Sequence, residues 1–582
     1  MINCHMHIFK AEHVPPFLAK TYILWPVYYL LHLGFIVSLF RFWYKKVVPI
    51  VLKPFYKRLM ILKTAISWFL NAINPIKIII SYYLTIQVFF ITFDFVVYMA
   101  DHIFHIPPPD VKAKVEKAGI WLSDHYLLLP FKSIGTGWKI LLVLFVFLLI
   151  PSGRNLILFI FKSIWKFLTY LPGKEVKEMF RRYLNIGRYA FHTRQSASLQ
   201  QICAQYPPGT GFVVLPMDME RMAAGPVKIS YRDQMKELAG IKESARYKNT
   251  IFPFIFADPR RIADENDYFV YTVNNNEVVL GDCFIKEYFI DKKFSGIKIY
   301  PALGYYPFDE RLLALWKYTA DHQIPIITHC IRGTIFYRGS KKLIWNRHPV
   351  IKQAAGNNEY IPLLLPETNN VDFTPNFTHP LNYLCLLDET RLRVLVENAV
   401  DPRIKELFGF TNADTPLTHD LSHLKLCFGH FGGDDEWKKY FEKDRYGYSA
   451  QLVQEPDTGI KFNLNEKNQP SPGKPEQIWK WTDWYSIICS MILQYDHVYA
   501  DISYILHDDA AILPLLKQTL QNKGLRDKVL YGTDFYVVRN HKSDRNMIAD
   551  MTGGLDTDDF DTIARDNPRN FLYNDIHGNI PI

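Results

Sequence analysis

The chain has 582 residues, 15% of them aromatic, and a formal net charge of +9 at neutral pH. This length is greater than one hydrophobic core usually holds, so we expect two or more units. No nucleic-acid-binding motif accompanies the positive charge, which favours an anionic membrane surface over DNA or RNA as a partner. The seven cysteines are scattered and include no CxxC pair, which argues against a disulfide framework.

The chain begins with a short predicted strand, residues 1–9, that contains His5 and His7. Side chains two positions apart on a strand share a face, so both imidazoles can reach one metal ion. A His-x-His pair also arises by chance in a chain with 19 histidines. The basic start and short apolar run of a signal peptide are absent here, and we therefore expect the catalytic part to face the cytoplasm.

Residues 20–175 have a different composition, with apolar runs at 22–44, 76–100, 138–150 and 156–171. The first two runs reach the roughly 20 residues that cross a bilayer. Charged residues interrupt them, and the basic segment 41–63 would lie on the wrong side if the first run crossed outward. Three alternatives remain: interfacial or re-entrant helices, a spanning pair made by later runs, and a soluble helical cap. We expect an inserted, mostly helical, membrane-associated domain.

The rest of the chain reads as an alternation of strands and helices. A helix is predicted from Asp309, because apolar residues recur there at helical spacing and acidic residues occupy the first turn. Further helices are predicted at 175–190, 381–400, 477–493 and 556–572. Two long polar loops are expected at 331–380 and 432–476. The remaining strands are predicted at 211–215, 250–256, 296–300, 324–328, 424–430, 497–502 and 528–534.

Eight strands that mostly alternate with helices predict an α/β protein of the (β/α)₈ barrel type. Its first strand would lie in residues 1–19, the inserted domain in 20–175 and the rest of the barrel in 176–582. Catalytic groups of such barrels come from the C-terminal ends of the strands. Five metal-binding or proton-transferring residues end predicted strands here: His5, His7, His329, His430 and Asp534. Imidazole and carboxylate ligands suit Zn²⁺ or a similar divalent ion.

The motifs NCHMH, FVVLPMDME, PFIFADPRR, GIKIYPALGYYP, PIITHC, CFGHFGG, YGTDF and DNPRNFL occur in this order. With them, the chain resembles the amidohydrolase superfamily, in particular the aminocarboxymuconate-semialdehyde decarboxylase-like subgroup. The resemblance covers residues 1–10 and about 176–575. It implies a metal held by His5, His7, His329 and Asp534, with His430 as a further ligand or an acid/base and electrostatic group. It also implies that Asp534 takes a proton from the metal-bound water.

Lys298 bears on the number of metal ions. In binuclear members of the superfamily, a lysine of the fourth strand is carbamylated and bridges two ions. The sequence motif around Lys298 is instead similar to that of the mononuclear subgroup. We expect one divalent ion, zinc first, and a second ion only if Lys298 is carbamylated. Lys298, Tyr300 and Arg332 are predicted to bind substrate. For Arg332 and the basic residues after it, lipid headgroups and a solvated loop are the alternatives.

The predicted activity is a membrane-associated, metal-dependent hydrolysis in which activated water attacks an amide, ester or lactone carbonyl. A non-oxidative decarboxylase is the alternative within enzymes, and an inactive membrane-bound binding or scaffold protein is the alternative of another class. The apolar insertion follows the first strand, on the active-site face of the barrel. It therefore favours an amphipathic or lipid-derived small molecule as substrate. A homo-oligomer remains open.

Overall fold

A computed structural model describes most of the chain outside residues 16–78 and 139–191. The described residues are 1–15, 79–80, 82–93, 109–128, 135, 138, 192 and 194–579, the last range without 334, 357–358, 443, 465–470, 472 and 536. The chain forms two compact units, Met1–Val37 with Met179–Ile582, and Ser38–Glu178. The domain boundaries predicted at residues 20 and 175 remain a prediction.

The second unit contains two described helical segments, residues 79–93 without 81, and α5 (Pro109–Asp124). The first of these lies in the predicted apolar run at 76–100. The runs predicted at 22–44 and 156–171, nearly all of the run at 138–150, and the helix predicted at 175–190 lie outside the described residues. No helix in the part of the chain that the structure describes combines the length and the apolar character needed to cross a bilayer.

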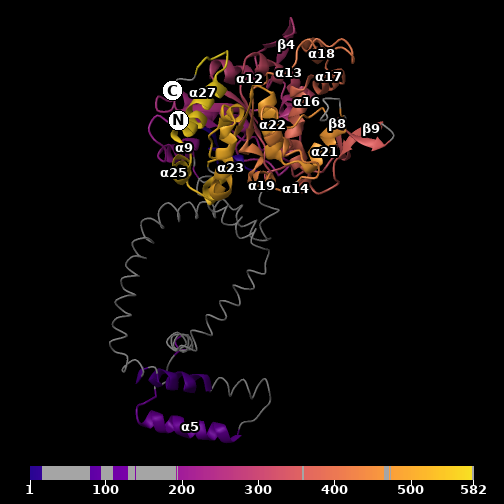
Figure 1. The fold of residues 1–582 in the computed structure, drawn as a ribbon. Helices are drawn as coiled ribbons and strands as arrows, with labels where there is room; N and C mark the ends of the chain where they lie inside the picture. Colours follow the sequence, from indigo (N-terminus) through magenta and orange to yellow (C-terminus); the bar gives the residue numbers. More distant parts are fainter. Residues whose placement is uncertain are drawn as a thin grey trace. The chain divides into compact units, whose positions relative to one another are not determined.

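Eight parallel strands of the first unit form one sheet, and helices surround it (Figure 1). In hydrogen-bonded order they are β1 (Ile2–Met6), β2 (Gly211–Val214), β3 (Ile251–Phe256), β6 (Gly296–Ile299), β7 (Ile326–His329), β10 (Leu426–Gly429), β11 (Val498–Asp501) and β12 (Val529–Leu530). The residues after β12 return to β1, where Cys4 N donates to Tyr531 O at 2.8 Å and Asp534 N donates to His5 O at 2.9 Å. The predicted eight-stranded parallel barrel is therefore confirmed, with each strand in its predicted place.

Helices follow most of the strands. The longer ones are α9 (Gln195–Cys203), α10 (Tyr231–Glu243), α13 (Glu310–Asp321), α17 (Glu389–Glu397), α21 (Lys474–Trp481), α22 (Trp484–Gln494), α23 (Asp509–Gln521) and α25 (Asp544–Gly554). Shorter ones are α11 (Pro259–Asp264), α12 (Phe284–Lys286), α14 (Asn370–Phe373), α15 (Pro375–Thr378), α16 (Leu384–Leu387), α18 (Pro402–Leu407), α19 (Asp434–Lys439), α20 (Gln451–Gln454), α24 (Lys523–Arg526), α26 (Thr557–Asp561) and α27 (Asn567–Leu572).

Capping residues explain where several helices begin. The helix predicted from Asp309 is α13, and the Asp309 carboxylate accepts from Arg311 N at 3.2 Å. The single helices predicted at 381–400 and 477–493 are each divided instead. Asp388 caps α17 by accepting from Arg391 N, and Asp483 caps α22 by accepting from Ser486 N. Each aspartate has extended backbone dihedrals, which end the preceding helix.

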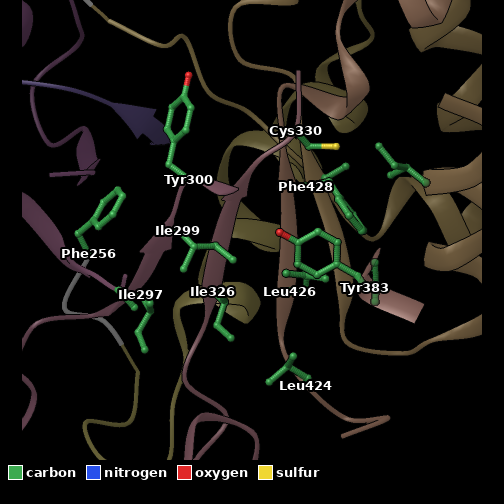
Figure 2. Close-up of a cluster of buried hydrophobic side chains, with 14 of the residues drawn as sticks. Phe256, Ile297, Ile299, Tyr300, Ile326, Cys330, Tyr383, Leu424, Leu426 and Phe428 are labelled. Carbon is green, nitrogen blue, oxygen red and sulfur yellow. The ribbon is translucent and has the colours of Figure 1, made fainter. Parts of the chain in front are cut away.

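The core has two parts, because alternate residues of each strand face opposite sides of the sheet. Inside the barrel, one buried cluster joins side chains of seven of the eight strands: Ile2, Cys4, Val213, Leu215, Phe252, Phe254, Ile327, Cys427, Tyr499 and Leu530. The alternate positions belong to the larger cluster, and Figure 2 shows Ile297, Ile299, Ile326, Leu426 and Phe428 in it. Lys298 lies between Ile297 and Ile299, at an interior position of β6.

Two antiparallel hairpins extend the barrel. The first joins β4 (Tyr271–Asn274) to β5 (Glu277–Leu280) through Asn275 and Asn276, which both have positive φ. The second joins β8 (Arg347–Gly356) to β9 (Glu359–Leu364) and projects beyond the helices around the barrel (Figure 1). It lies within the long polar loop predicted at 331–380, which therefore contains regular structure.

Candidate active site

His5 and His7 lie at the C-terminal end of β1, where the pairing with β2 shifts register between Asn3 and Met6. Such an irregularity redirects side chains at a strand end. His5 Nδ1 lies 2.8 Å from Asp501 Oδ2, and His7 Nδ1 lies 2.8 Å from the carbonyl oxygen of Leu215. Both acceptors require a proton on Nδ1, so each ring presents the lone pair of Nε2.

The Nε2 atoms of these two histidines face Asp534. Asp534 Oδ1 lies 3.3 Å from His7 Nε2 and 4.0 Å from His5 Nε2, and all three side chains are buried. Two lone pairs and a carboxylate oxygen at these distances repel each other unless a cation, a proton or a metal ion, lies among them. Histidines that bind a metal through Nε2 usually donate from Nδ1 to a carboxylate or a carbonyl oxygen, as His5 and His7 do here.

A chain of hydrogen bonds orients two further histidines. Ser503 Oγ donates to Asp501 Oδ1, and His430 Nδ1 lies 2.9 Å from Ser503 Oγ. His430 therefore donates from Nδ1 and accepts at Nε2, where His329 Nδ1 lies 3.1 Å away. His329 consequently donates from Nδ1, and its Nε2 is buried without a hydrogen-bond partner among the described residues. His5 Nε2 is likewise buried without a hydrogen-bond partner among the described residues. Two buried acceptors are therefore available for a metal ion.

Burial keeps these imidazoles neutral. It lowers the pKa of His5 and of His329 well below the ordinary value, and the nearby positive charge of Lys298 adds to the effect in both. Burial also lowers the pKa of His430 to about 3. Neutral imidazole is the form that binds a metal ion, so the environment prepares the site without a competing proton.

Within the part of the chain that the structure describes, two groups of three residues have ligand atoms close enough for one ion: His5 with His7 and Asp534, and His5 with His430 and Asp501. His329 belongs to neither group, although its ring lies 4.8 Å from that of His430. The structure thus brings the five predicted strand-end residues to one place. Whether His329 completes the ligand set, as the resemblance implies, and whether His430 is catalytic remain predictions.

The predicted substrate-binding residues lie in different surroundings. Lys298 is fully buried, its Nζ lacks a hydrogen-bond partner among the described residues, and burial lowers its pKa to about 8. The Tyr300 ring stacks on His329 at 3.8 Å between centroids, and its hydroxyl points away from the end of β6 (Figure 2). Arg332 is exposed and lies over the Trp484 ring at 5.8 Å. Lys298 and Tyr300 therefore reach the histidine cluster, whereas Arg332 belongs to the loop after β7.

The backbone at the site is under local constraint. His430 and Asp534 both have positive φ, at 65° and 59°, which is uncommon for residues with a side chain. Two glycines allow the strands to approach His5. A Cβ on Gly532 would lie 2.9 Å from His5 Cβ, and one on Gly429 would lie 3.1 Å from His5 Cε1. Strained or side-chain-free positions of this kind concentrate at functional sites.

Asp501 and Ser503 are the site residues that the sequence-based prediction omitted. Asp501 ends β11 and accepts hydrogen bonds from His5 Nδ1, from Ser503 Oγ and from the backbone amides of His430 and Ser503. The available signal was an aspartate at the end of the strand predicted at 497–502, the same position that identified the other candidates.

No family model matches the chain, and no curated protein matches it. Two solved structures align with 65% of this chain. One is an uncharacterized TIM-barrel protein from Bordetella bronchiseptica, 11% identical over 82% of its own chain, with a TM-score of 0.29. The other is an amidohydrolase from Mycobacterium avium subsp. paratuberculosis, 14% identical over 73% of its chain, with a TM-score of 0.28.

Proposed function

We propose that the chain is a metal-dependent hydrolase of the amidohydrolase type that cleaves an amide, ester or lactone bond. The observation that carries the proposal is the orientation of three imidazoles at the C-terminal end of the barrel. In His5, His7 and His329, Nδ1 is engaged by another protein atom, so that Nε2 is left as an acceptor. Such an arrangement is suited to a divalent cation and serves no purpose in an apolar core.

His5, His7 and Asp534 would hold the ion, with His329 as the further ligand. Zinc fits this set of nitrogen and oxygen donors best. When bound, a divalent ion lowers the pKa of a coordinated water molecule and polarises a carbonyl group. Lys298, at an interior position of β6 and buried beside these groups, marks the place where carbamylation would allow a second ion.

The chain's own residues supply the remaining steps. Asp534, beside His7 at 3.3 Å, accepts the proton of the attacking water and returns it to the leaving group. His430 has both ring nitrogens engaged in the protein, so its role in this proposal is to position His329 and, through Ser503, Asp501. The Tyr300 hydroxyl, beyond the stacked rings, would donate to the substrate carbonyl. Arg332 would meet an anionic group of the substrate.

The test combines metal analysis with a substrate panel. The purified chain and the variant His5→Ala/His7→Ala would be assayed for bound metal and for acid release from amides, esters and lactones. His423→Ala is the control, because the partly buried His423 precedes β10 and lies 4.0 Å from Asp321 at the end of α13, rather than at the C-terminal ends of the strands. Metal-dependent acid release that only the double variant loses is the expected result. Release of CO₂ instead would identify a decarboxylase, and a folded chain that binds no metal would indicate a binding or scaffold protein.

A further inference from the structure

We propose that residues 341–347, KKLIWNR, form a docking surface for a membrane that contains anionic phospholipids. This segment, called here the 341–347 loop, contains the short 3₁₀ helix η7 (Leu343–Asn346) and leads into β8. It follows β7 by way of residues 331–340, in the connection after the strand that ends in His329. The docking surface therefore belongs to the same face of the barrel as the candidate active site.

The centre of the surface is an exposed apolar pair. Leu343 is 81% exposed and Ile344 is 76% exposed. The next residue, Trp345, is turned the other way: its ring packs against those of Phe373 at 6.2 Å and Phe377 at 5.0 Å. Trp345 is partly buried against these rings, whereas the two aliphatic side chains before it remain exposed to water, which is unfavourable for apolar groups.

The hairpin adds to the apolar surface and fixes the loop in place. Leu365 N donates to Asn346 O at 2.9 Å, and Arg347 is paired with Leu364 across β8 and β9. Leu364 is 46% exposed. A third exposed aliphatic side chain therefore lies on β9 opposite Arg347, and backbone hydrogen bonds join the end of η7 to this strand.

Basic residues flank this apolar pair in the sequence. Residues 331–358 contain no Asp or Glu, and their basic residues are Arg332, Arg338, Lys341, Lys342, Arg347 and Lys352. Among the described residues, Lys342 and Arg347 form no ion pair, and Lys341 lies over the Phe373 ring at 4.1 Å. Glu359, the nearest acidic residue that follows in sequence, is exposed, pairs with Gly356 at the turn end of the hairpin and forms no ion pair among the described residues. Glu367 and Asp372, which follow it, are also exposed and form no ion pair with the loop.

This combination matches the chemistry of a lipid surface. Aliphatic side chains bury at the boundary between headgroups and acyl chains, while lysine and arginine remain at the level of the phosphates. The exposed Leu343 and Ile344 side chains can enter the fluid surface of a bilayer, whereas a protein partner would need a pocket complementary to them. The 341–347 loop exposes no aromatic side chain of the kind that usually anchors a protein–protein interface, since Trp345 packs against Phe373 and Phe377. The lipid surface is therefore the better occupant.

The experiment reports on the loop itself, in the full chain, and needs neither metal nor turnover. Ile344→Cys would carry an environment-sensitive fluorophore, and Cys203 and Cys283, the native cysteines that are not buried, would be changed to Ser. The labelled chain would be mixed with vesicles of phosphatidylcholine alone, or with phosphatidylserine added at about 30%. The matched control is the same label at Val400→Cys, because Val400 is 88% exposed and follows an acidic helix end.

We expect a blue shift of the label at position 344 with phosphatidylserine, none with phosphatidylcholine alone, and none at position 400 with either. Adding Lys342→Gln and Arg347→Gln should lower the ratio of docked to free label about 30-fold, since each basic residue near an anionic surface contributes about fivefold. No shift at 344, an equal shift in both vesicles, or a shift without lipid that rises with protein concentration would each overturn the proposal. The last outcome would identify a second copy of the chain as the occupant.

Discussion

Replacing Asp501 by Asn should remove His5 from the set of metal-binding groups without removing any of the proposed ligands, His5, His7, His329 and Asp534. Asp501 Oδ1 accepts from the backbone amides of His430 and Ser503 at 3.1 and 3.0 Å and from Ser503 Oγ, while Oδ2 accepts from His5 Nδ1 at 2.8 Å. An asparagine amide group placed on the first side would face three donors. It therefore turns to the second side, where it donates to His5 Nδ1.

The exchange reverses the proton on the imidazole. His5 would accept at Nδ1 and carry its proton on Nε2, the atom that faces Asp534. In the variant, the tautomer of His5 that can bind metal, with the proton on Nδ1, no longer has a carboxylate to donate to. The lost hydrogen bond to a charged group is worth about 1.5–3 kcal/mol. Each 1.36 kcal/mol corresponds to a factor of ten, so the affinity for zinc should fall about 10- to 100-fold.

The assay is a competition titration of zinc between the protein and a chromophoric chelator, with thermal unfolding of the metal-free proteins measured beside it. Asp372→Asn is the control, because Asp372 is exposed and its side chain makes no contact with the site. Zinc affinity of Asp501→Asn within about threefold of the parent, in a protein that unfolds normally, would refute the assignment of the His5 tautomer and with it the metal site.

Three further results are expected. Elemental analysis should find about one zinc ion per chain, and about two would assign Lys298 as a carbamylated bridge. His348 donates to Asn382 and accepts from two backbone amides, and burial lowers its pKa to about 4. Its contribution to the free energy of unfolding is complete above pH 6.5 and is lost as the pH falls toward 4, by about 3 kcal/mol at most. The free energy of unfolding in urea should therefore depend less on pH in His348→Gln over that range. An unchanged pH profile would contradict this expectation. Gly532→Ala places a methyl group 2.9 Å from His5 Cβ and should weaken zinc binding and lower stability by about 1–3 kcal/mol. Gly553→Ala, in α25 with open space around it, should leave zinc binding unchanged and should not lower stability.

The positions of the strands could be read from the sequence because each is a short apolar run that ends in a polar residue. The strand predicted at 296–300 is β6, and that at 497–502 is β11. The strand predicted at 528–534 is shorter as β12, since the chain beyond Leu530 pairs with β1 by separate backbone bonds. Periodicity identifies such elements well and their ends less well.

The helix breaks and the hairpins were missed for local reasons. Asp388 and Asp483 stand inside stretches of continuous helical periodicity, and an apolar pattern alone does not show that an aspartate acts there as a cap. The β4–β5 hairpin has the turn residues Asn275 and Asn276, which favour the positive φ that the turn needs. Attention to capping and turn residues would have found these features.

The role of Asp501 could not follow from its own neighbourhood in the sequence. It stands in β11, and β1 has β2 and the end of β12 as its hydrogen-bonded neighbours. Asp501 therefore reaches His5 across the interior of the closed barrel, which becomes visible only when all eight strands are placed. The tautomers of His5, His430 and His329 depend on that one contact and on Ser503.

Closure of the barrel has a consequence for the order of events during synthesis. Asn3 donates to Thr533, a residue 530 positions later in the chain, and His5 and Asp534 are joined across the same seam. The first strand leaves the ribosome long before its last partner exists, so it waits without a neighbour on that side. Assembly of the candidate metal site must then be among the final steps of folding, and a chain stalled before Asp534 would present His5 and His7 without the carboxylate that faces their Nε2 atoms.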